Sequence, residues 1–322
     1  MFKTALCAVA FRVPTGFFTH DLCQSYDQGK GNPESAARVE AIEDQMIASG
    51  LTRCVVPLPS SEASYADVLR AHDADYLERL RGWSRAAKAG MQTVSEDTVV
   101  NALSFSAAMK SAGAAIEAVR QVCSGSLRNA FACIRPPGHH AGRNFAHGFC
   151  LINSVACAAL HALDEIGLKR VAIIDIDVHR ADGTEDIVRT DPRIQLFSLY
   201  QDTAFPYGLP KATAPNIVNT PLPEGTEGAD VLRIVHEEWI PKLLAFKPEL
   251  ILLSAGFDAH RDEKQALFKL TEFDYSYLTY EIMRLAKCVC SERLVSILEG
   301  GYNIRSLARS AVAHMTTLTK PI

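Results

Sequence analysis

The sequence predicts an α/β fold with a mostly parallel central β-sheet and helices on both faces. Apolar runs of strand length alternate with stretches of helix length, a pattern typical of covered parallel sheets. Acidic, histidine and tyrosine side chains follow four of these runs, and ligands of open α/β sheets bind outside the carboxyl ends of the strands. With 322 residues, 48% of them hydrophobic, the chain can bury one large core, so we expect a single domain over residues 1–322.

The expected strands are short apolar runs, most of them rich in β-branched residues. A strand that is buried on both faces should be apolar throughout, because neither face meets water. The expected strands cover residues 5–11, 130–134, 171–174 with an extension to 179, 194–199, 250–253 and 294–297.

The expected helices are longer segments, two of which are rich in alanine. The first has Asn32 as a candidate cap and Pro33 in its first turn, and the third is stopped by Gly167. The helices cover residues 33–49, 104–122, 154–166, 229–245, 272–286 and 304–318. Residues 201–227 contain many Pro, Gly and Thr residues, and we expect loops around a functional site there.

Three side chains with metal-binding chemistry follow the apolar run 171–174. In a strand, Asp175, Asp177 and His179 would share one face, about 6.5 Å from one to the next. Buried carboxylates are costly unless they are compensated, and a bound cation would compensate both acids together. The alternative is a structural salt bridge to Arg170 or Arg180.

Three other strand exits carry reactive side chains. His139 and His140 follow the run 130–134, and adjacent imidazoles suit general acid–base work near neutral pH. Asp258 follows the apolar run 250–253, and Tyr302 follows the run 294–297. Taken singly, the histidines could form a hydrogen-bonded structural pair, Asp258 a helix cap and Tyr302 a turn aromatic. Taken together, four such strand exits predict one functional site.

Composition excludes some classes of partner and indicates a compartment. The net charge is −4 and the sequence pI is about 6.2, so no basic surface for nucleic acid is expected. The apolar run 5–11 is too short to span a membrane, and no membrane partner is expected. Nine cysteines without a CxxC pair predict free thiols and a cytoplasmic location.

Five motifs occur along the chain, four of them at the predicted strand exits. They are RPPGHHA at 135–141, GFCLIN at 148–153, DIDVH at 175–179, SAGFDAH at 254–260 and LEGGYN at 298–303. Together they resemble the zinc-dependent histone deacetylase family, most closely its class II-like and bacterial amidohydrolase branch with the acetylpolyamine amidohydrolases. The resemblance covers nearly the whole chain. It implies an arginase/deacetylase-like fold, one catalytic domain over 1–322 and an active site at the carboxyl ends of the strands.

The resemblance implies two metal ions. Asp177, His179 and Asp258 would hold one zinc ion and leave positions open for water and a substrate carbonyl. A monovalent cation, usually potassium, would be bound as a structural ion. Its ligands would come from Asp175, Asp177, His179, Ser198 and Leu199.

Catalytic roles follow from the same resemblance. His140 would be the general base and acid, and His139 would act mainly through its charge. Asp175 would orient His139 and Asp182 would orient His140, each through the second ring nitrogen. Tyr302 would donate its hydroxyl to the substrate carbonyl oxygen.

The substrate-binding residues are also implied by the resemblance. Phe149 and Phe205 would form the walls of a narrow tunnel, with Gly148 and Gly301 beside them. Asp97 would lie on the rim and grip a backbone amide or cationic part of the substrate. The substrate would be an acylated small molecule or an acyl-lysine peptide, and a homo-oligomer is possible.

The chain departs from the family pattern next to the metal ligands. Relatives usually carry histidine and glycine where this chain has Arg180 and Ala181, and Arg180 could pair with a nearby acid.

The sequence therefore favours a zinc-dependent deacylase that hydrolyses the amide of an acetylated or otherwise acylated amine, such as acetyl-lysine or acetylpolyamine. One alternative is a non-catalytic relative that binds an acyl ligand. Another is a different small-molecule amidohydrolase of the same fold. A binuclear manganese hydrolase like the arginases would need a second full set of metal ligands, and His139, His140 and Tyr302 favour the deacylase instead.

Overall fold

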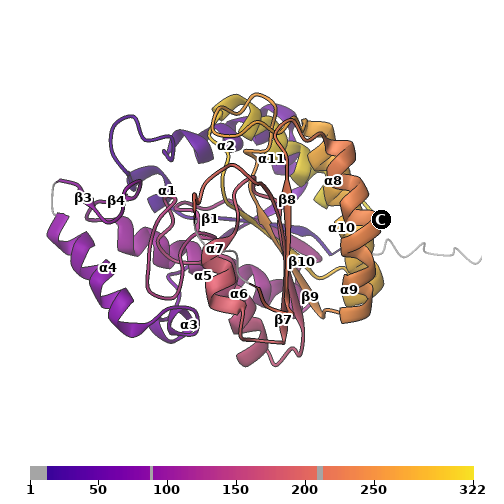
Figure 1. Cartoon of the computed structure of the whole chain (residues 1–322), viewed down its shortest axis with the longest axis horizontal. Coiled ribbons are helices and arrows are strands. Elements are labelled where there is room, and N and C mark those ends of the chain that lie inside the picture. Colours follow the sequence, from indigo (N-terminus) through magenta and orange to yellow (C-terminus); the bar gives the residue numbers. More distant parts are fainter. Residues whose placement is uncertain (1–12, 88–89, 209–212) are drawn as a thin grey trace, which may run out of the picture.

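An eight-stranded, wholly parallel β-sheet forms the centre of the protein (Figure 1). The structure is a computed structural model that describes residues 13–87, 90–208 and 213–322. The strand order is β2-β1-β5-β10-β9-β6-β7-β8. The strands are β1 (Thr15–Thr19), β2 (Val55–Pro59), β5 (Asn129–Ala132), β6 (Val171–Asp175), β7 (Ile194–Gln201), β8 (Ile217–Leu222), β9 (Leu250–Ala255) and β10 (Leu294–Leu298). A separate antiparallel pair is formed by β3 (Gln92–Thr93) and β4 (Val99–Val100).

Helices cover both faces of the sheet (Figure 1). The helices are α1 (Leu22–Ser25), α2 (Ala37–Ser49), α3 (Tyr65–Leu69), α4 (Ala74–Ala87), α5 (Ser104–Cys123), α6 (Ser154–Asp164), α7 (Asp182–Val188), α8 (Gly228–Ile234), α9 (Ile240–Phe246), α10 (Glu272–Cys290) and α11 (Ile304–Thr319), with short turns η1 (Leu51–Arg53) and η2 (Val235–Trp239). Helices α5 and α6 pack together over one face, and α2, α10 and α11 pack together over the other. The predicted α/β class is confirmed.

Alternate strand residues enter two separate hydrophobic cores. In β6, Val171 and Ile173 pack on the α5–α6 side, whereas Ala172 and Ile174 pack on the α10–α11 side. Because both faces are dry, burying each Val or Ile side chain contributes about 1.5–3 kcal/mol. The apolar character of the central strands is therefore required by the two layers of helices that cover them.

The five predicted central strands are confirmed as β5, β6, β7, β9 and β10, with shifted ends. The strand predicted at 5–11 lies outside the described residues. Residues 201–227 were expected to be loops throughout, and this is wrong at β8, an edge strand. Strands β1 and β2 were not expected. Both β2 and β8 contain proline, which edge strands tolerate and which weakens the strand pattern.

Two predicted boundaries are wrong in ways that affect the site. The helix expected from residue 33 begins at Ala37, because the Asn32 side chain instead accepts the backbone N–H of Glu34 in a turn. The strand expected up to residue 179 ends at Asp175. Asp177 and His179 therefore lie in the loop after the strand and do not continue its alternation.

The remaining predicted helices correspond to helical segments. The segment 229–245 is divided into α8, the wider turn η2 and α9. Among the described helices, none combines the length and the apolar composition needed to cross a membrane.

Candidate active site

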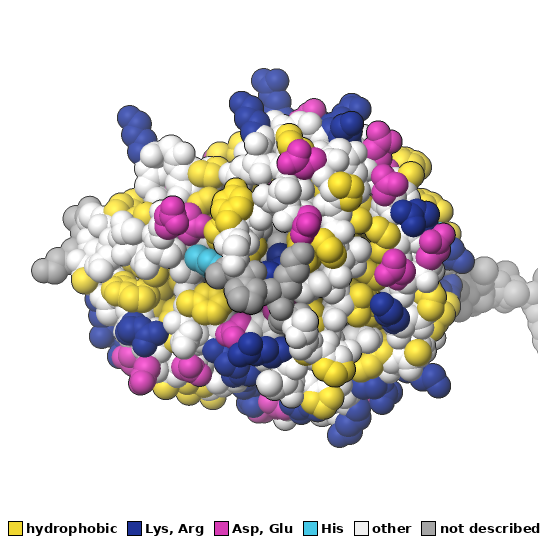
Figure 2. Space-filling model, in the orientation of Figure 1, with side chains coloured by type: hydrophobic (Ala, Val, Ile, Leu, Met, Phe, Trp, Pro, Cys, Tyr) yellow, Lys and Arg dark blue, Asp and Glu magenta, His cyan; other side chains and the backbone are white. Residues whose placement is uncertain are grey.

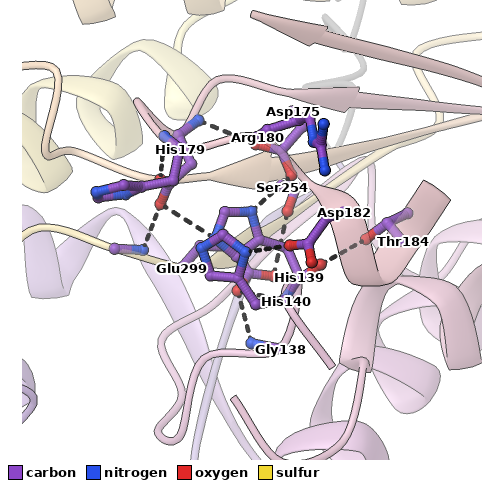
Figure 3. Close-up of polar contacts among 12 residues, drawn as sticks. Gly138, His139, His140, Asp175, His179, Arg180, Asp182, Thr184, Ser254 and Glu299 are labelled. Atoms are coloured by element: carbon purple, nitrogen blue, oxygen red, sulfur yellow. Dashed lines mark hydrogen bonds and ion pairs between the residues drawn. The ribbon is translucent and has the colours of Figure 1, made fainter. Parts of the chain in front are cut away.

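The site is built at the carboxyl ends of four neighbouring strands, β5, β10, β9 and β6 (Figure 3). His139 and His140 follow β5, Asp258 follows β9, and Tyr302 follows β10. Because the strands are parallel and adjacent, residues that are far apart in the sequence meet at one edge of the sheet.

Three side chains form a compact, buried cluster with metal-binding chemistry. One ligand atom from each of Asp177, His179 and Asp258 lies within 4.8 Å of the others. His179 Nδ1 is 2.8 Å from Asp177 Oδ1 and 3.2 Å from Asp258 Oδ2. Backbone groups orient the acids, since Gly300 N donates to Asp177 Oδ2 and Val178 N donates to Asp258 Oδ1. Two carboxylates and one imidazole match a three-ligand site for a divalent metal ion.

The surroundings of this cluster fit a bound cation. Asp258 Oδ2 is buried and receives no hydrogen bond within the described part of the chain. Burial, together with the Asp177 carboxylate, raises the pKa of Asp258, although the neighbouring His179 imidazole opposes the shift. A Cβ atom at Gly300 would lie 2.1 Å from Asp258 Oδ2 and 2.5 Å from Asp177 Oδ2, so a glycine is required beside the ligands.

The two adjacent histidines each contact a different carboxylate (Figure 3). His139 Nδ1 lies 3.1 Å from Asp175 Oδ2, and His140 Nδ1 lies 2.6 Å from Asp182 Oδ1. The two rings are 4.0 Å apart between centroids. Burial opposes a charge on His139, but the carboxylates of Asp177 and Asp175 outweigh it and hold the pKa of His139 well above its usual value. Burial and the neighbouring His139 lower the pKa of His140 to about 3. The pair therefore favours one charged and one neutral imidazole.

The turn that carries these histidines is held by an acid that sequence reasoning missed. Glu299 Oε2 accepts the backbone N–H groups of Gly138 and His139, and Glu299 Oε1 accepts the hydroxyl of Ser254 (Figure 3). Glu299 lies within a recognised motif, but nothing in its spacing indicates which backbone it binds.

A second missed contact joins His147 to the site. Asp182 is shared between two imidazoles, because His147 Nε2 lies 2.7 Å from Asp182 Oδ2. Both oxygens of this carboxylate are thereby fixed, and so is the direction in which His140 points.

The metal-site cluster, the two adjacent histidines and Tyr302 are called the floor of the site. Buried ion pairs lie in the segments next to these residues. Arg135 Nε and Nη2 donate to the two oxygens of Glu34 at 2.5 and 2.9 Å, a bidentate geometry. Arg38 Nη1 also donates to Glu34, and Arg38 Nε donates to the carbonyl of Gly301 at 2.7 Å. All three charged side chains are fully buried, so the pairing compensates what would otherwise be a large desolvation cost.

Tyr302 lies between a cation and an aromatic ring. The Arg38 guanidinium is 4.8 Å from the ring centroid of Tyr302, and the Phe149 ring meets it edge-on at 5.6 Å. Burial raises the pKa of the phenol well above its usual value, although Arg38 opposes the shift. Tyr302 therefore keeps its proton and can donate a hydrogen bond.

The backbone of Tyr302 is anchored by Glu263, which sequence reasoning also missed. Glu263 Oε2 accepts the backbone N–H groups of Tyr302 and Asn303 at 2.8 and 2.9 Å. Glu263 Oε1 accepts the N–H of Lys264 at 2.8 Å. One buried carboxylate therefore connects the Tyr302 loop with the loop after Asp258.

A pocket of about 420 Å³ leads to these groups. Phe149, Phe205 and Tyr302 line it, with His140 and His179 among the deeper residues. The Phe205 ring meets the His140 ring edge-on at 4.9 Å. The pocket is thus a passage with aromatic walls that ends at imidazoles.

Of the three remaining residues predicted to bind the substrate, two line the pocket and one does not. Asp97 and Gly148 both line the pocket, and both oxygens of Asp97 accept the Gly148 N–H at 3.0 Å. A Cβ atom at Gly148 would lie 2.4 Å from His140 Cδ2, so only glycine fits there. Gly301 does not line the pocket, and its carbonyl is bound by Arg38.

The residues predicted for a monovalent cation lie in β6, in the loop that follows it and in β7. Asp175 pairs with Ser198 in the sheet register, and Leu199 is the next residue of β7. The Ser198 hydroxyl is buried without a hydrogen-bond partner in the described residues, which leaves an acceptor free beside the Asp175 strand end.

Arg180, the residue after His179, lies beside an acidic side chain. Arg180 Nε lies 3.7 Å from Glu185 Oε1, and both side chains are buried. The expected pairing of Arg180 with a nearby acid is therefore present, with a residue of α7.

Parallel strands, histidine–carboxylate pairs and a three-residue candidate metal cluster form a candidate active site on an α/β fold, and comparison with known proteins identifies the family. The histone deacetylase domain matches residues 32–318. A probable deacetylase of Archaeoglobus fulgidus is 34% identical over 298 residues, covering 90% of this chain and 82% of that protein. The polyamine deacetylase HDAC10 of Mus musculus is 32% identical over 310 residues, covering 91% of this chain and 46% of that protein.

Solved structures agree with these sequence relatives. The crystal structure of the HDA15 HD domain superposes with a TM-score of 0.87 at 28% identity, covering 95% of this chain and 88% of that chain. The chain belongs to the histone deacetylase family, and it is a deacetylase with the family's fold. The family resemblance, the fold and the assignment as an enzyme are confirmed.

Proposed function

We propose that the protein is a zinc-dependent deacylase that hydrolyses the amide of an acetylated or otherwise acylated amine. The observation that carries this proposal is the convergence of the Asp177, His179 and Asp258 cluster with the His139–His140 pair at the end of one aromatic pocket. Acetyl-lysine and acetylpolyamines both present such an amide on a slim chain.

Asp177, His179 and Asp258 would hold the zinc ion. Bound zinc is a Lewis acid that polarises a carbonyl and makes water nucleophilic near neutral pH. The Ser198 hydroxyl, which is buried and has no hydrogen-bond partner among the described residues, supports a structural potassium site beside Asp175. Leu199 would contribute its backbone to this site.

His140 is the proposed general base and acid. Its lowered pKa leaves it neutral at physiological pH, and the contact of Nδ1 with Asp182 places the ring proton there. Nε2 is then free to take a proton from the attacking water and to return it to the leaving amine. His139, whose Nδ1 lies 3.1 Å from Asp175 Oδ2, would act mainly electrostatically beside the developing oxyanion.

Tyr302 is the proposed donor to the carbonyl oxygen. Its phenol stays protonated, and the ring is fixed between Arg38 and Phe149. A donor that is already in place costs no reorganisation when charge develops on the oxygen. Phe149 and Phe205 would flank the methylene chain of the substrate, and Asp97 would lie at its entrance.

Turnover assays on three substrate types test the proposal. Acetyl-lysine peptides, acetylpolyamines and small acetylated metabolites should be assayed for acetate release with zinc present and with zinc chelated. We expect zinc-dependent release from at least one type, which would exclude a non-catalytic acyl-binding role. Absence of release from all three with zinc loaded would contradict the proposal. The cytoplasmic location and a homo-oligomer remain predictions.

A further inference from the structure

Two charged side chains that line the pocket, Asp97 and Lys264, differ in their contacts with the rest of the protein. Among the described residues that line it, Asp97 is the one carboxylate and Lys264 the one amine. Asp97 accepts the Gly148 N–H through both oxygens and also the hydroxyls of Ser95 and Thr98. This half-buried acid therefore holds the backbone beside His140 with both of its oxygens.

The acid next to Lys264 is also directed inward. Glu263 is 9% exposed and accepts three backbone N–H groups, from Tyr302, Asn303 and Lys264 itself. Its negative charge is compensated by these dipoles inside the protein. The same contact fixes the backbone of Lys264 at the rim.

Lys264 is the exposed charged side chain among the described residues that line the pocket. Its side chain is exposed, and its neighbour in the pocket lining, Gln265, is neutral. Lys264 takes part in none of the ion pairs found within the described part of the chain. An unpaired cation at the mouth of a cleft attracts anionic ligands and repels cationic ones.

We propose that Lys264 makes the enzyme selective for acylated amines that carry a carboxylate at the far end of the chain, and selective against polycations. This inference rests on the proposed deacylase function and narrows its substrate class. The amide would enter the aromatic passage while the carboxylate stays at the rim beside Lys264. Because Lys264 does not reach the reacting amide, its effect should fall on kcat/KM through KM, with kcat little changed.

Three matched substrates provide the test, since they share the acetamide and a five-carbon chain and differ in terminal charge. They are N-acetylcadaverine, N-pentylacetamide and N-acetyl-ε-aminocaproate. At low salt we expect kcat/KM for the carboxylate to exceed that for the ammonium by roughly tenfold. Raising the ionic strength to about 1 M, where the Debye length is about 3 Å, should remove most of the difference.

Substitutions at two lysines separate the effect of the charge at the pocket from the effect of the protein's net charge. Lys264→Met should bring the three substrates close together, and Lys264→Glu should reverse their order. Lys242→Glu makes the same change of net charge on the exposed face of α9 and should leave the order unchanged.

The outcomes distinguish the two proposals. Hydrolysis of these amides with the ammonium substrate equal or preferred, or an order that Lys264→Glu does not alter, would overturn the role of Lys264 and leave the deacylase proposal intact. If the zinc-loaded enzyme hydrolyses none of the three and also fails on acetyl-lysine peptides, both proposals are overturned. Failure on the carboxylate substrate alone overturns the selectivity proposal.

Discussion

The floor of the pocket and its rim are held in place to very different degrees. Floor residues such as His139, Asp177 and Asp258 are at most 2% exposed, and backbone or carboxylate partners fix each of them. On the rim, Tyr207 is 74% exposed and Lys264 has an exposed side chain. Figure 2 shows basic and acidic side chains interspersed over one face of the molecule, with hydrophobic side chains beside a visible histidine.

This difference separates chemistry from substrate choice. Reaction geometry tolerates little displacement, because a misplacement of about 1 Å can cost 100-fold in rate. The rim can change its charge without disturbing the floor, since surface substitutions usually alter stability by less than about 0.5 kcal/mol. Glu263 is the exception, because one carboxylate binds both the Tyr302 backbone and the Lys264 backbone.

The largest effect of a single substitution is expected at Tyr302, on the floor. Tyr302→Phe removes the proposed donor to the carbonyl oxygen and should lower kcat by roughly 100- to 1,000-fold, or about 3–4 kcal/mol. Steady-state kinetics with metal analysis measures this. Tyr280→Phe removes the same atom from the exposed face of α10 and is the control. A kcat within threefold of wild type would contradict the role of Tyr302.

A smaller effect is expected from protonating His72, which supports the floor from behind. His72 Nδ1 contacts the Gly142 carbonyl at 2.8 Å, and its Nε2 accepts the Asn153 N–H at 2.9 Å. Burial lowers the pKa of His72 to about 4, whereas the unfolded chain titrates near about 6.5. The folded state therefore binds fewer protons between these values. His72 should lower the free energy of unfolding by about 1.4 kcal/mol for each pH unit from 6.5 down to 4.

Denaturant unfolding between pH 7 and pH 4.5, combined with an NMR titration of the imidazole, measures this effect. The His72 resonance should stay that of a neutral ring down to about pH 5, by the linkage argument. A His72 that titrates near its ordinary pKa in the folded protein would contradict a neutral imidazole held between the Gly142 carbonyl and the Asn153 N–H.

The third effect in order of size is expected at Glu263, the residue that joins floor and rim. Glu263→Gln replaces one of the two acceptor oxygens by an NH2 donor, so that at least one of the three backbone N–H groups loses its acceptor, and an unsatisfied buried N–H costs about 1–3 kcal/mol. We expect a kcat roughly tenfold lower, partly recovered in Glu263→Asp. If kcat is unchanged while the thermal midpoint falls, Glu263 stabilises the fold without positioning Tyr302.

The smallest effect is expected on the rim. Tyr207→Ala removes an exposed ring that meets Phe205 edge-on at 6.1 Å. We expect kcat to stay within about twofold and KM to change by less than about threefold, since exposed contacts contribute little. A loss of kcat comparable to that of Tyr302→Phe would show that the rim takes part in the chemistry and would remove the contrast.

Sequence alone predicted the parts of this molecule whose signals are local. The central strands were predicted because burial between two layers demands unbroken apolar runs, and the motifs at their ends brought together His139, His140, Asp258 and Tyr302. Edge strands β2 and β8 were missed because their prolines and partly exposed residues weaken the pattern.

Contacts between distant residues could not be predicted. Glu263 and Tyr302 are 39 positions apart, and His147 and Asp182 are 35 apart, so no spacing rule connects them. The alternation argument for Asp177 and His179 was wrong because the strand ends at Asp175, and the two side chains converge through a loop. The roles of these residues in catalysis remain proposals.

Zinc titration of the metal-free enzyme tests the central claim most directly. Chain that has been stripped of metal, as shown by metal analysis, is loaded with increasing zinc while turnover of an acetylated amine is followed. We predict negligible turnover without metal, a linear rise, and a break at about one zinc per chain, as three protein ligands around one ion require. Full turnover of the metal-free chain, or a break at two metal ions per chain, would contradict the account.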